Sequence, residues 1–448
     1  MNKALSKEAL FSSAPIRKAV FSLAAPTVLS QLITVIYNMA DTFFVGRLGD
    51  PLMVAAATVS MPLFMLLTAF ANLFGIGGAS LISRALGAGN KNRGARCSAF
   101  CIFGAAAVSL FYGVLIMIFE NAVLPVLGAD GETTGFASSY IFWTVGIGSL
   151  PTVMNPLLSH LVRSEGYSKQ ASFGIALGGI LNMLLDPLFI FVFRMGITGA
   201  AVATLISNVI ATAYFLLFIF VNRHILAVNF LPKNFTFGDK IPQEVISVGL
   251  PSFFISMMAT VSNTVLNNII SSYENAAVAG MGIAKKIDLV AFAAAQGMTQ
   301  GTLPLIGYNF SSGNKKRMHD SIKALFLMCL VVSLSAATAL FFGAKAVTAC
   351  FINDAATVSY GQMFLKIICL ACPTTALNFF AITVFQATGK KIQPIILSLL
   401  RKGSLDVLLM FVFNLLFGLS GVAWATPAAD SVALIISAVL VVPYIKKL

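Results

Sequence analysis

The chain has 448 residues, of which 58% are hydrophobic and 10% are charged, and its formal net charge is +13. Soluble globular domains carry about 25% charged residues, so this composition excludes a chain that covers itself with a water-facing surface. The basic residues are spread between apolar runs and form no continuous face with interleaved aromatic side chains. The charge therefore does not indicate nucleic acid, and no nucleic-acid partner is expected.

Long apolar runs dominate the sequence, among them Phe100–Phe119, Gly174–Phe193 and Ala324–Phe342. Runs of about 18 or more residues with few charges predict membrane-spanning helices. The strands of a membrane barrel would be about ten residues long with alternating polarity, a pattern that is not seen. We therefore expect an all-α integral membrane protein with twelve transmembrane helices. In chain order they are expected at residues 17–47, 53–85, 95–121, 134–162, 169–194, 197–222, 243–272, 277–308, 318–343, 357–387, 392–417 and 421–445.

The connections between these helices differ in charge. Lys and Arg gather at both termini and in alternate connections, such as Arg84–Arg96 and Lys315–Arg317, while the other connections hold few of them. Short loops rich in Lys and Arg stay in the cytoplasm, so both termini are expected there. The longest connection without a helix, Asn222–Pro242, belongs to the same side and divides the chain near its midpoint.

The two halves of the sequence resemble each other. The segment "GNKNR" recurs as "GNKKR", and "GITGAAVAT" recurs as "GLSGVAWAT". With a pair of prolines, these matches lie 222 to 225 positions apart: Gly89–Arg93 with Gly313–Arg317, Gly196 with Gly418, and Pro26 with Pro251. Because each repeat holds six spans, an even number, both repeats have the same orientation in the membrane.

This repeat predicts two six-helix bundles related by pseudo-twofold symmetry about an axis along the membrane normal. The N-lobe, helices 1–6, is expected at residues 1–222, and the C-lobe, helices 7–12, at residues 243–448. A cytoplasmic inter-lobe loop is expected at residues 223–242. Transporters built from repeats bind their substrate at the repeat interface, so the pattern indicates transport by alternating access.

Signatures of enzymes are absent from the sequence. It contains no G-x-x-x-x-G-K-[ST] phosphate loop and no H-E-x-x-H, and His160, His224 and His319 each stand alone. The six cysteines lie mostly inside predicted helices, where cysteine behaves as a small apolar residue. We expect neither an enzyme nor a bound cofactor.

Acidic residues inside the predicted spans are informative. A carboxylate at the centre of a spanning helix costs about 2.5–3.5 kcal/mol, so its presence suggests a function. Five such residues occur: Asp41, Asp186, Asp288, Asp406 and Asp430. Lys285 and Lys402 precede Asp288 and Asp406 by three and four residues, a spacing that allows an intrahelical ion pair. For these two acids a structural and a functional role are both open, and Asp430 has no such neighbour.

Asp41 and Asp186 lie in apolar stretches of the first half. Asp41 belongs to "YNMADTFFVGRLG", where the first basic residue is Arg47. Asn182 lies one turn before Asp186 on the same helix face, and Pro187 releases a backbone carbonyl that could bind a cation. The two acids predict a cation site confined to the first lobe. The alternative is that both acids only accept hydrogen bonds from neighbouring hydroxyls or amides.

Several motifs together resemble the MATE (multidrug and toxic compound extrusion) family, in its MepA-like or DinF-like bacterial branch. They are "DTFFVGRLG", "SRALGAGN", "LNMLLDPLFIF" and "GAAVAT" in the first half, and "GYNFSSGNKKR" and "GLSGVAWAT" in the second. The resemblance covers nearly the whole chain. It implies an antiporter in the bacterial cytoplasmic (inner) membrane that exports amphipathic, often cationic, organic compounds in exchange for protons or sodium ions. We further expect a monomer whose partners are small organic cations and membrane lipids.

The resemblance also implies a first-lobe site that binds the coupling proton or sodium ion. The matching positions are Tyr37, Asp41, Asn155, Asn182, Asp186 and Thr204, of which Asp41, Asn182, Asp186 and Thr204 form a possible sodium site. Two neighbouring carboxylates cannot both ionise cheaply, which suits a proton carrier. Pro26 is a helix-bending candidate because a proline inside a helix removes a backbone hydrogen bond. Some branches also carry acids in helices 7 and 10, but Val261–Asn268 and Thr374–Gln386 have none.

A flippase of a lipid or lipid-linked sugar is the alternative function. Such a protein would use several cations to hold a phosphate group. The cationic residues that keep this reading open are Lys285, Lys286, Arg401 and Lys402.

The charge bias predicts the topology directly. A reporter fused to the C-terminus should read cytoplasmic, and so should one inserted in Asn222–Pro242, because both lie on the Lys/Arg-rich side. Alkaline phosphatase and fluorescent-protein fusions distinguish the two sides of the membrane. Periplasmic signals at both places would contradict twelve spans with cytoplasmic ends.

Overall fold

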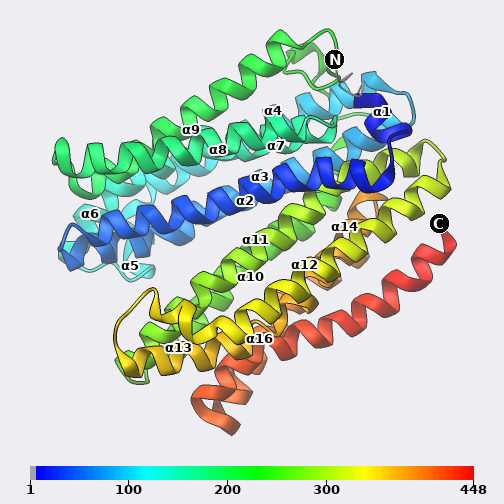
Figure 1. Cartoon of the computed structure of the whole chain (residues 1–448). Coiled ribbons are helices and arrows are strands. Elements are labelled where there is room, and N and C mark those ends of the chain that lie inside the picture. The colour runs from blue at the N-terminus through cyan, green and yellow to red at the C-terminus, as the bar shows by residue number, and fades with distance from the viewer. Residues whose placement is uncertain (1–6) are drawn as a thin grey trace, which may run out of the picture. The chain divides into compact units, whose positions relative to one another are not determined.

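The computed structural model describes residues 7–448 (Figure 1), and within that range it contains helices and no strand. The α-helices are α1 (Lys7–Ser12), α2 (Ile16–Gly46), α3 (Pro51–Gly87), α4 (Lys91–Ile118), α5 (Glu120–Val126), α6 (Gly131–Ile141), α7 (Ser149–Ser164), α8 (Ser168–Pro187), α9 (Gly196–Val221), α10 (Ile241–Ile270), α11 (Asn275–Ser311), α12 (Lys315–Ala349), α13 (Ala355–Ile368), α14 (Ala371–Ala387), α15 (Ile392–Leu399) and α16 (Asp406–Lys447). Three π-helical segments, η1 (Phe142–Ile147), η2 (Leu188–Val192) and η4 (Leu400–Leu405), continue α-helices, and η3 (Pro232–Asn234) is a 3₁₀ turn.

The repeated "GN" motifs form the same turn in both halves. Gly89 and Gly313 have φ values of 72° and 73°, a left-handed conformation that glycine adopts at helix ends. The following asparagines, Asn90 and Asn314, are the N-caps of α4 and α12, and each accepts a hydrogen bond from the backbone N–H three residues later. The sequence repeat is therefore also a repeat of local structure.

By length and composition, nine helical segments of the described chain can cross a membrane, or ten if the pair Gly131–Ile147 and Ser149–Ser164, bent by 50°, is one span. Two further features bring this number to the expected twelve. Helix α11 is long enough but carries Lys285, Lys286 and Asp288 in its middle. The segment Ile392–Lys447 has 56 residues, about 84 Å of helix, which is enough for two crossings.

A break inside α16 separates the last two spans. Gly418 has φ 59° and ψ −141°, a conformation that only glycine adopts readily. The chain bends visibly in this region (Figure 1, orange to red). This glycine opens the repeated "GLSGVAWAT", and its counterpart Gly196, at the start of α9, also has positive φ.

The helices group into two compact units, and the boundaries fall inside α2 and α10. One unit holds residues 32–256, and the other holds residues 7–31 with 257–448. These units differ from the predicted lobes at residues 1–222 and 243–448. The first segment of α2 groups with the second half of the chain, and the first segment of α10 groups with the first half. The lobe boundaries at residues 222 and 243, which were inferred from the sequence repeat, remain a prediction.

In the unit of residues 32–256, α3 packs on α4 and α7, and α8 lies beside α9 (Figure 1). The first segment of α10 lies directly against α3, because a Cβ on Gly249 would meet the carbonyl oxygen of Leu73 at 1.8 Å. Arg84 and Arg93 form ion pairs with Glu244 at 3.2 and 2.7 Å. These pairs fix the start of α10 to the turn between α3 and α4.

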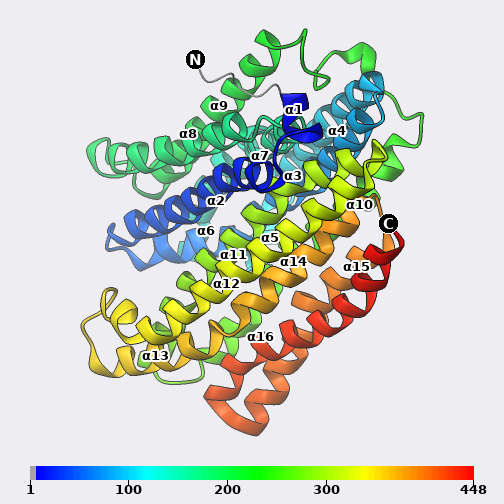
Figure 2. The same cartoon turned by 45° about the vertical axis from the view of Figure 1, so that its right-hand side comes forward.

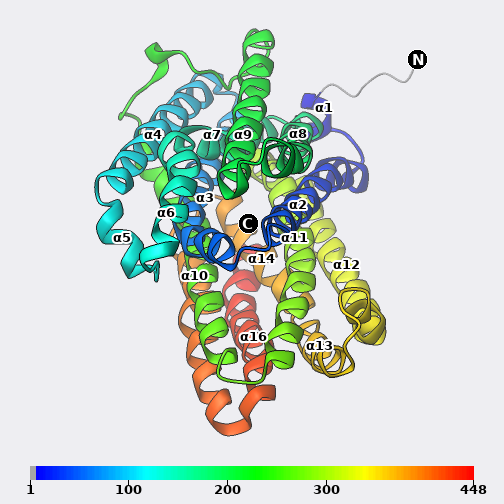
Figure 3. The same cartoon turned by 90° about the vertical axis from the view of Figure 1, so that its left-hand side faces the viewer.

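In the unit of residues 7–31 and 257–448, α11 packs on α12, α13 and α14, and α14 packs on α16 (Figure 2). Helix α13 returns beside the end of α12 (Figure 3). The first segment of α2 packs closely on α11, since a Cβ on Gly301 would lie 2.8 Å from the backbone of Ala24. Arg317 donates to the carbonyls of Phe11 and Leu10 at 2.5 and 3.0 Å. Arg317 thus fixes α1, just as the repeat-related Arg93 fixes α10.

Gly418→Ala tests the break in α16. A methyl group at Gly418 has space, since the nearest atom is 3.9 Å away, so any loss of stability comes from the backbone conformation. We expect a loss of about 1–3 kcal/mol, measured as a lower Tm of the detergent-solubilised protein. Gly282→Ala in α11 is the matched control, with open space and an ordinary helical φ, and it should leave Tm unchanged or raise it. Equal Tm shifts for the two variants would contradict a strained break at Gly418.

Candidate functional site

A polar cluster lies in the unit of residues 32–256, on α2, α8 and α9. Asn182 on α8 donates through its side-chain nitrogen to Oδ1 of Asp186 at 3.3 Å and to Oγ1 of Thr204 on α9 at 3.2 Å. Asn182 and Asp186 are fully buried. Their i,i+4 spacing places them on one face of α8, as the sequence predicts. The structure therefore brings together Asn182, Asp186 and Thr204.

Asp41 reaches the same cluster from α2. Its carboxylate is close enough to interact electrostatically with that of Asp186, and both interact with the hydroxyl of Tyr37 one turn earlier on α2. Close packing permits this approach, because a Cβ on Gly179 of α8 would lie 2.8 Å from the ring of Tyr37. Because Gly179 has no side chain, α2 can pack closely on α8, and this close packing brings Asp41 to the cluster.

The cluster has more acceptors than donors. Four of the buried side-chain oxygens that lack a hydrogen-bond partner among the described residues belong to this cluster and its neighbour Asn155: Asp41 Oδ1, Asn155 Oδ1, Asn182 Oδ1 and Asp186 Oδ2. Buried acceptors without donors are costly, and each needs an explanation. Carboxylate and amide oxygens are also the ligands that hard cations prefer. A proton or a small cation would satisfy them.

Two further polar residues adjoin the cluster. Asn155 on α7 donates to Asn208 on α9 at 3.0 Å, and Asn208 donates to Thr152 at 3.4 Å, so Asn155 belongs to an adjoining amide chain. Tyr140 on α6 was not predicted, yet its hydroxyl interacts electrostatically with Asp41 and Asp186. No motif marks Tyr140, since only the packing of α6 brings it there.

Pro26, the helix-bending candidate, lies inside α2, which continues through it as one helix. The surrounding segment is tied to α11 by Gln31, whose side-chain nitrogen donates to Gln296 at 3.1 Å and Gln300 at 3.3 Å. Bending at Pro26 stays a prediction.

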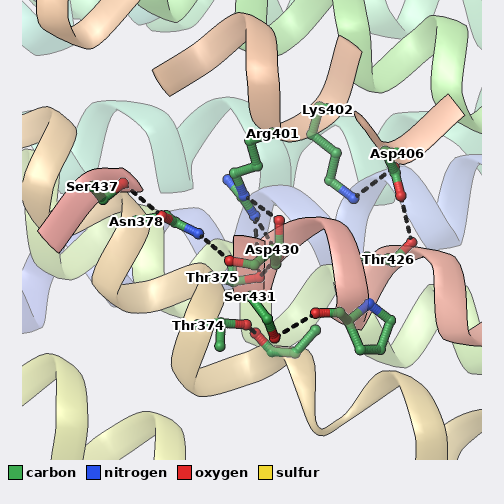
Figure 4. Close-up of polar contacts among 12 residues, drawn as sticks. Thr374, Thr375, Asn378, Arg401, Lys402, Asp406, Thr426, Asp430, Ser431 and Ser437 are labelled. Atoms are coloured by element: carbon green, nitrogen blue, oxygen red, sulfur yellow. Dashed lines mark hydrogen bonds and ion pairs between the residues drawn. The ribbon is translucent and has the colours of Figure 1, made fainter. Parts of the chain in front are cut away.

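A second cluster of charges lies in the unit of residues 7–31 and 257–448 (Figure 4). Arg401 on η4 forms an ion pair with Asp430 on α16 at 2.8 Å, and both side chains are 1% exposed. Thr375 on α14 donates to Asp430 and accepts from Arg401. The guanidinium of Arg401 lies over the ring of Phe379, 4.7 Å from its centroid. The partner of Asp430, not found from sequence spacing, is thus 29 residues away.

Two further ion pairs adjoin this one. Lys402 pairs with Asp406 at 3.5 Å, and Asp406 also accepts from Ser262 at 2.6 Å and Thr426 at 3.1 Å. Lys285 on α11 pairs with Asp288 at 3.7 Å. Both pairs have the i,i+4 or i,i+3 spacing that the sequence offers. Lys285 interacts electrostatically with the acids of all three pairs, so the three pairs form one network.

The π-helical segment η4 sets the geometry of the network. Arg401 and Lys402 are consecutive in it, and they pair with different acids, Asp430 and Asp406. Single-turn π segments recur at functional sites. Since three of the four cations that suggested phosphate binding are paired with carboxylates, the network gives no specific support to a flippase.

The described residues contain no group of three or more His, Cys, Asp or Glu side chains that could hold a metal ion. The first cluster instead combines the carboxylates of Asp41 and Asp186 with the amide of Asn182 and the hydroxyl of Thr204.

Comparison with known families decides the assignment. The MatE family model matches residues 26–188 and 251–416, beginning at the two repeat-related prolines. This chain belongs to the MATE family. It is accordingly a multi-pass membrane protein of a transporter family and not an enzyme.

Curated relatives cover nearly the whole chain. The "Multidrug export protein MepA" of Staphylococcus aureus (strain NCTC 8325 / PS 47) is 31% identical over 433 residues, which is 96% of this chain and 94% of the relative. The protein of the same name from Staphylococcus saprophyticus is 30% identical over 432 residues, again 96% and 94%.

Solved structures share the fold. A MATE protein in complex with MaL6 has a TM-score of 0.92 at 23% identity, covering 100% of this chain and 99% of that one. An outward-facing multidrug resistance MATE family transporter of the MOP superfamily has a TM-score of 0.89 at 24% identity, with the same coverage. The all-α fold of two repeated six-helix halves is therefore the MATE fold.

The Arg401–Asp430 pair predicts a specific stability pattern. Asp430→Asn leaves a buried arginine without its counter-charge, which should cost about 3–5 kcal/mol and lower Tm in detergent. Arg401→Met combined with Asp430→Asn removes both charges and should recover most of that loss. Asp288→Asn is the matched control, because Lys285 is 19% exposed and water can screen its charge. A double variant as unstable as Asp430→Asn alone would show that the buried charge is not the cause.

Proposed function

We propose that this chain is a secondary active multidrug efflux antiporter of the bacterial cytoplasmic membrane, with both termini in the cytoplasm. It exports amphipathic, often cationic, organic compounds in exchange for protons or sodium ions. Two relatives about 30% identical over 94% of their length are named as multidrug export proteins, which supports the substrate class. Acids within spanning helices support coupling to a cation.

The four buried oxygens without donors carry this proposal. Two of them belong to Asp41 and Asp186, which repel each other when both are ionised. One bound positive charge relieves that repulsion and satisfies acceptors that are otherwise costly. A proton would sit on one carboxylate. A sodium ion would take oxygens from Asp41, Asn182, Asp186 and Thr204.

Coupling follows if the cation binds one conformation better than the other. A ligand shifts a conformational equilibrium only by its difference in affinity for the two states. In this mechanism the occupied cluster favours one opening of the transporter and the empty cluster the other. Pro26 is the proposed bending point of α2, whose later part carries Tyr37 and Asp41 to the cluster.

The membrane potential drives any exchange in which net positive charge moves inward. One charge moving through about 100 mV releases about 2.3 kcal/mol. At about 1.4 kcal/mol per factor of ten, each coupled charge supports a gradient of roughly fifty-fold. This is sufficient for efflux without ATP hydrolysis.

Asp186→Asn and Asp41→Asn test the coupling site. Each keeps the size of the side chain and removes its charge, so gradient-driven efflux should fall at least tenfold while expression and substrate binding persist. The measurement is dye efflux from proteoliposomes in which sodium and pH gradients are imposed independently. If either gradient alone drives efflux by the parent protein, it identifies the coupling ion.

Asp130→Asn is the matched control for the same chemical change. Asp130 is exposed at the N-cap of α6, outside the spans, and hydrogen bonds from Thr133 hold the pKa of its carboxyl below its ordinary value. Asparagine is an equally good N-cap, so this variant should transport normally. Parent-like rates and ion dependence in both Asp41→Asn and Asp186→Asn would contradict the proposed site.

A further inference from the structure

A directed chain of hydrogen bonds joins α7 to α9 beside the first cluster. Asn155 on α7 donates through its side-chain nitrogen to the side-chain oxygen of Asn208 on α9 at 3.0 Å. Asn208 donates through its own side-chain nitrogen to the hydroxyl of Thr152 at 3.4 Å. Because the nitrogen of Asn208 is engaged with Thr152, Asn208 presents its oxygen to Asn155. The carboxamide of Asn155 therefore turns its nitrogen toward α9.

The oxygen of Asn155 is left over by this arrangement. Asn155 is 8% exposed, and its Oδ1 is buried without a hydrogen-bond partner among residues 7–448. The side chain lies against α8, because its nitrogen would be 3.3 Å from a Cβ on Gly178, which is one turn before Asn182. Asn155 thus brings a second amide oxygen without a donor to the part of α8 that carries Asn182.

The second half of the chain holds counterparts of these three polar residues, 222 or 223 positions later. They are Thr375, Asn378 and Asp430, which correspond to Thr152, Asn155 and Asn208. Thr375 donates to the carboxylate of Asp430, and Asn378 donates to the backbone carbonyl of Asp430 at 2.9 Å. The oxygen of Asn378 also has a donor, the hydroxyl of Ser437 at 2.8 Å (Figure 4). Every polar end of Asn378 is therefore satisfied.

The donor that satisfies Asn378 has no counterpart in the first half. Ser437 corresponds to Phe215, 222 positions earlier on α9. Phe215 is fully buried, and its ring packs so closely on α8 that a Cβ on Gly174 would lie 2.3 Å from it. A phenylalanine side chain has no hydrogen-bond donor. The repeated asparagine is thus satisfied in the second half and keeps an unused oxygen in the first.

We propose that Asn208 is a positioning residue of the coupling site, which holds the carboxamide of Asn155 so that its oxygen is available to the bound cation. Asn208 acts through Asn155 and does not itself touch the cation. Phe215 keeps the oxygen available, because it stands where the second half has a hydroxyl donor. This inference rests on the proposed efflux function and adds to it a residue that sets the affinity for the coupling cation.

The orientation of a carboxamide matters because its two ends have opposite polarity. The oxygen of an asparagine binds sodium or accepts a hydrogen bond from a protonated carboxyl, whereas its NH₂ group repels a cation. Without the acceptor on Asn208, nothing in the chain fixes which end of Asn155 faces α8. A ligand that must first be ordered binds more weakly than one held in place beforehand. Loss of the acceptor should therefore weaken cation binding.

Asn208→Leu tests the positioning role in proteoliposomes of the full-length protein. Leucine has nearly the shape of asparagine but accepts no hydrogen bond, so the carboxamide of Asn155 is no longer held. Initial rates of tetraphenylphosphonium export are measured with sodium varied at fixed pH, and with pH varied in the absence of sodium. We expect the half-saturating concentration of the driving cation to rise about tenfold, which corresponds to about 1.4 kcal/mol. The KM for tetraphenylphosphonium at saturating cation should stay at the parent value.

Asn208→Asp is the conservative variant that separates positioning from packing. Its carboxylate cannot donate to Thr152, and neither can leucine, but it still accepts from Asn155. The half-saturating cation concentration should therefore stay at or below that of the parent protein. Asn121→Leu is the matched control for the leucine substitution, because Asn121 is exposed on α5. This control should leave the half-saturating concentration unchanged.

A pair of substitutions at Phe215 tests the missing donor independently. Phe215→Ser supplies a hydroxyl at the place where the second half has Ser437, and Phe215→Ala opens the same space without a donor. A hydroxyl bonded to the oxygen of Asn155 competes with the cation. The half-saturating cation concentration should therefore be about tenfold higher in Phe215→Ser than in Phe215→Ala.

The comparison of Asn208→Leu with Asn208→Asp decides the proposal. An unchanged half-saturating concentration in Asn208→Leu, with coupled export lost in Asp186→Asn, would refute the positioning role and leave the coupling site standing. Equal increases in Asn208→Leu and Asn208→Asp would also refute it, because packing alone would then be the cause. If no cation gradient drives export by the parent protein, the efflux function fails and the positioning role fails with it.

Discussion

The high cost of an ionised side chain away from water shapes this protein. With 10% charged residues, the chain places few of them inside its spans, and the five aspartates expected there lie in ion pairs or beside other polar groups. The two halves meet this constraint differently. The second half neutralises its acids with lysine and arginine, whereas the first half leaves Asp41 and Asp186 beside amides and hydroxyls. The three acids of the second half thus have counter-charges within the protein, whereas no ion pair within residues 7–448 includes Asp41 or Asp186.

This contrast gives the repeated halves different electrostatics. A repeat could in principle bind one coupling ion in each half. Here the acids Asp288, Asp406 and Asp430 of the second half are already neutralised in three ion pairs. In the proposed mechanism, the coupling ion therefore binds in the first half.

Much of the fold could be predicted from sequence because it rests on patterns within one helix or on repeated motifs. The spans follow from apolar runs, and Asn182–Asp186 and Lys402–Asp406 follow from helical spacing. Tertiary contacts could not be predicted in the same way. Asp430 finds Arg401 across the π segment η4, and Tyr140 reaches the acids through the packing of α6. The exchange of the first segments of α2 and α10 likewise leaves no local signal, since both helices are continuous.

That exchange has a consequence for how the protein is made. Residues 16–31 leave the ribosome well before α11 (Asn275–Ser311), the helix on which they pack, is synthesised. The early segment must wait in the membrane, shielded by lipid or by the insertion machinery, until the second half arrives. A chain that ends before α11 therefore leaves the first segment of α2 without the helix on which it packs.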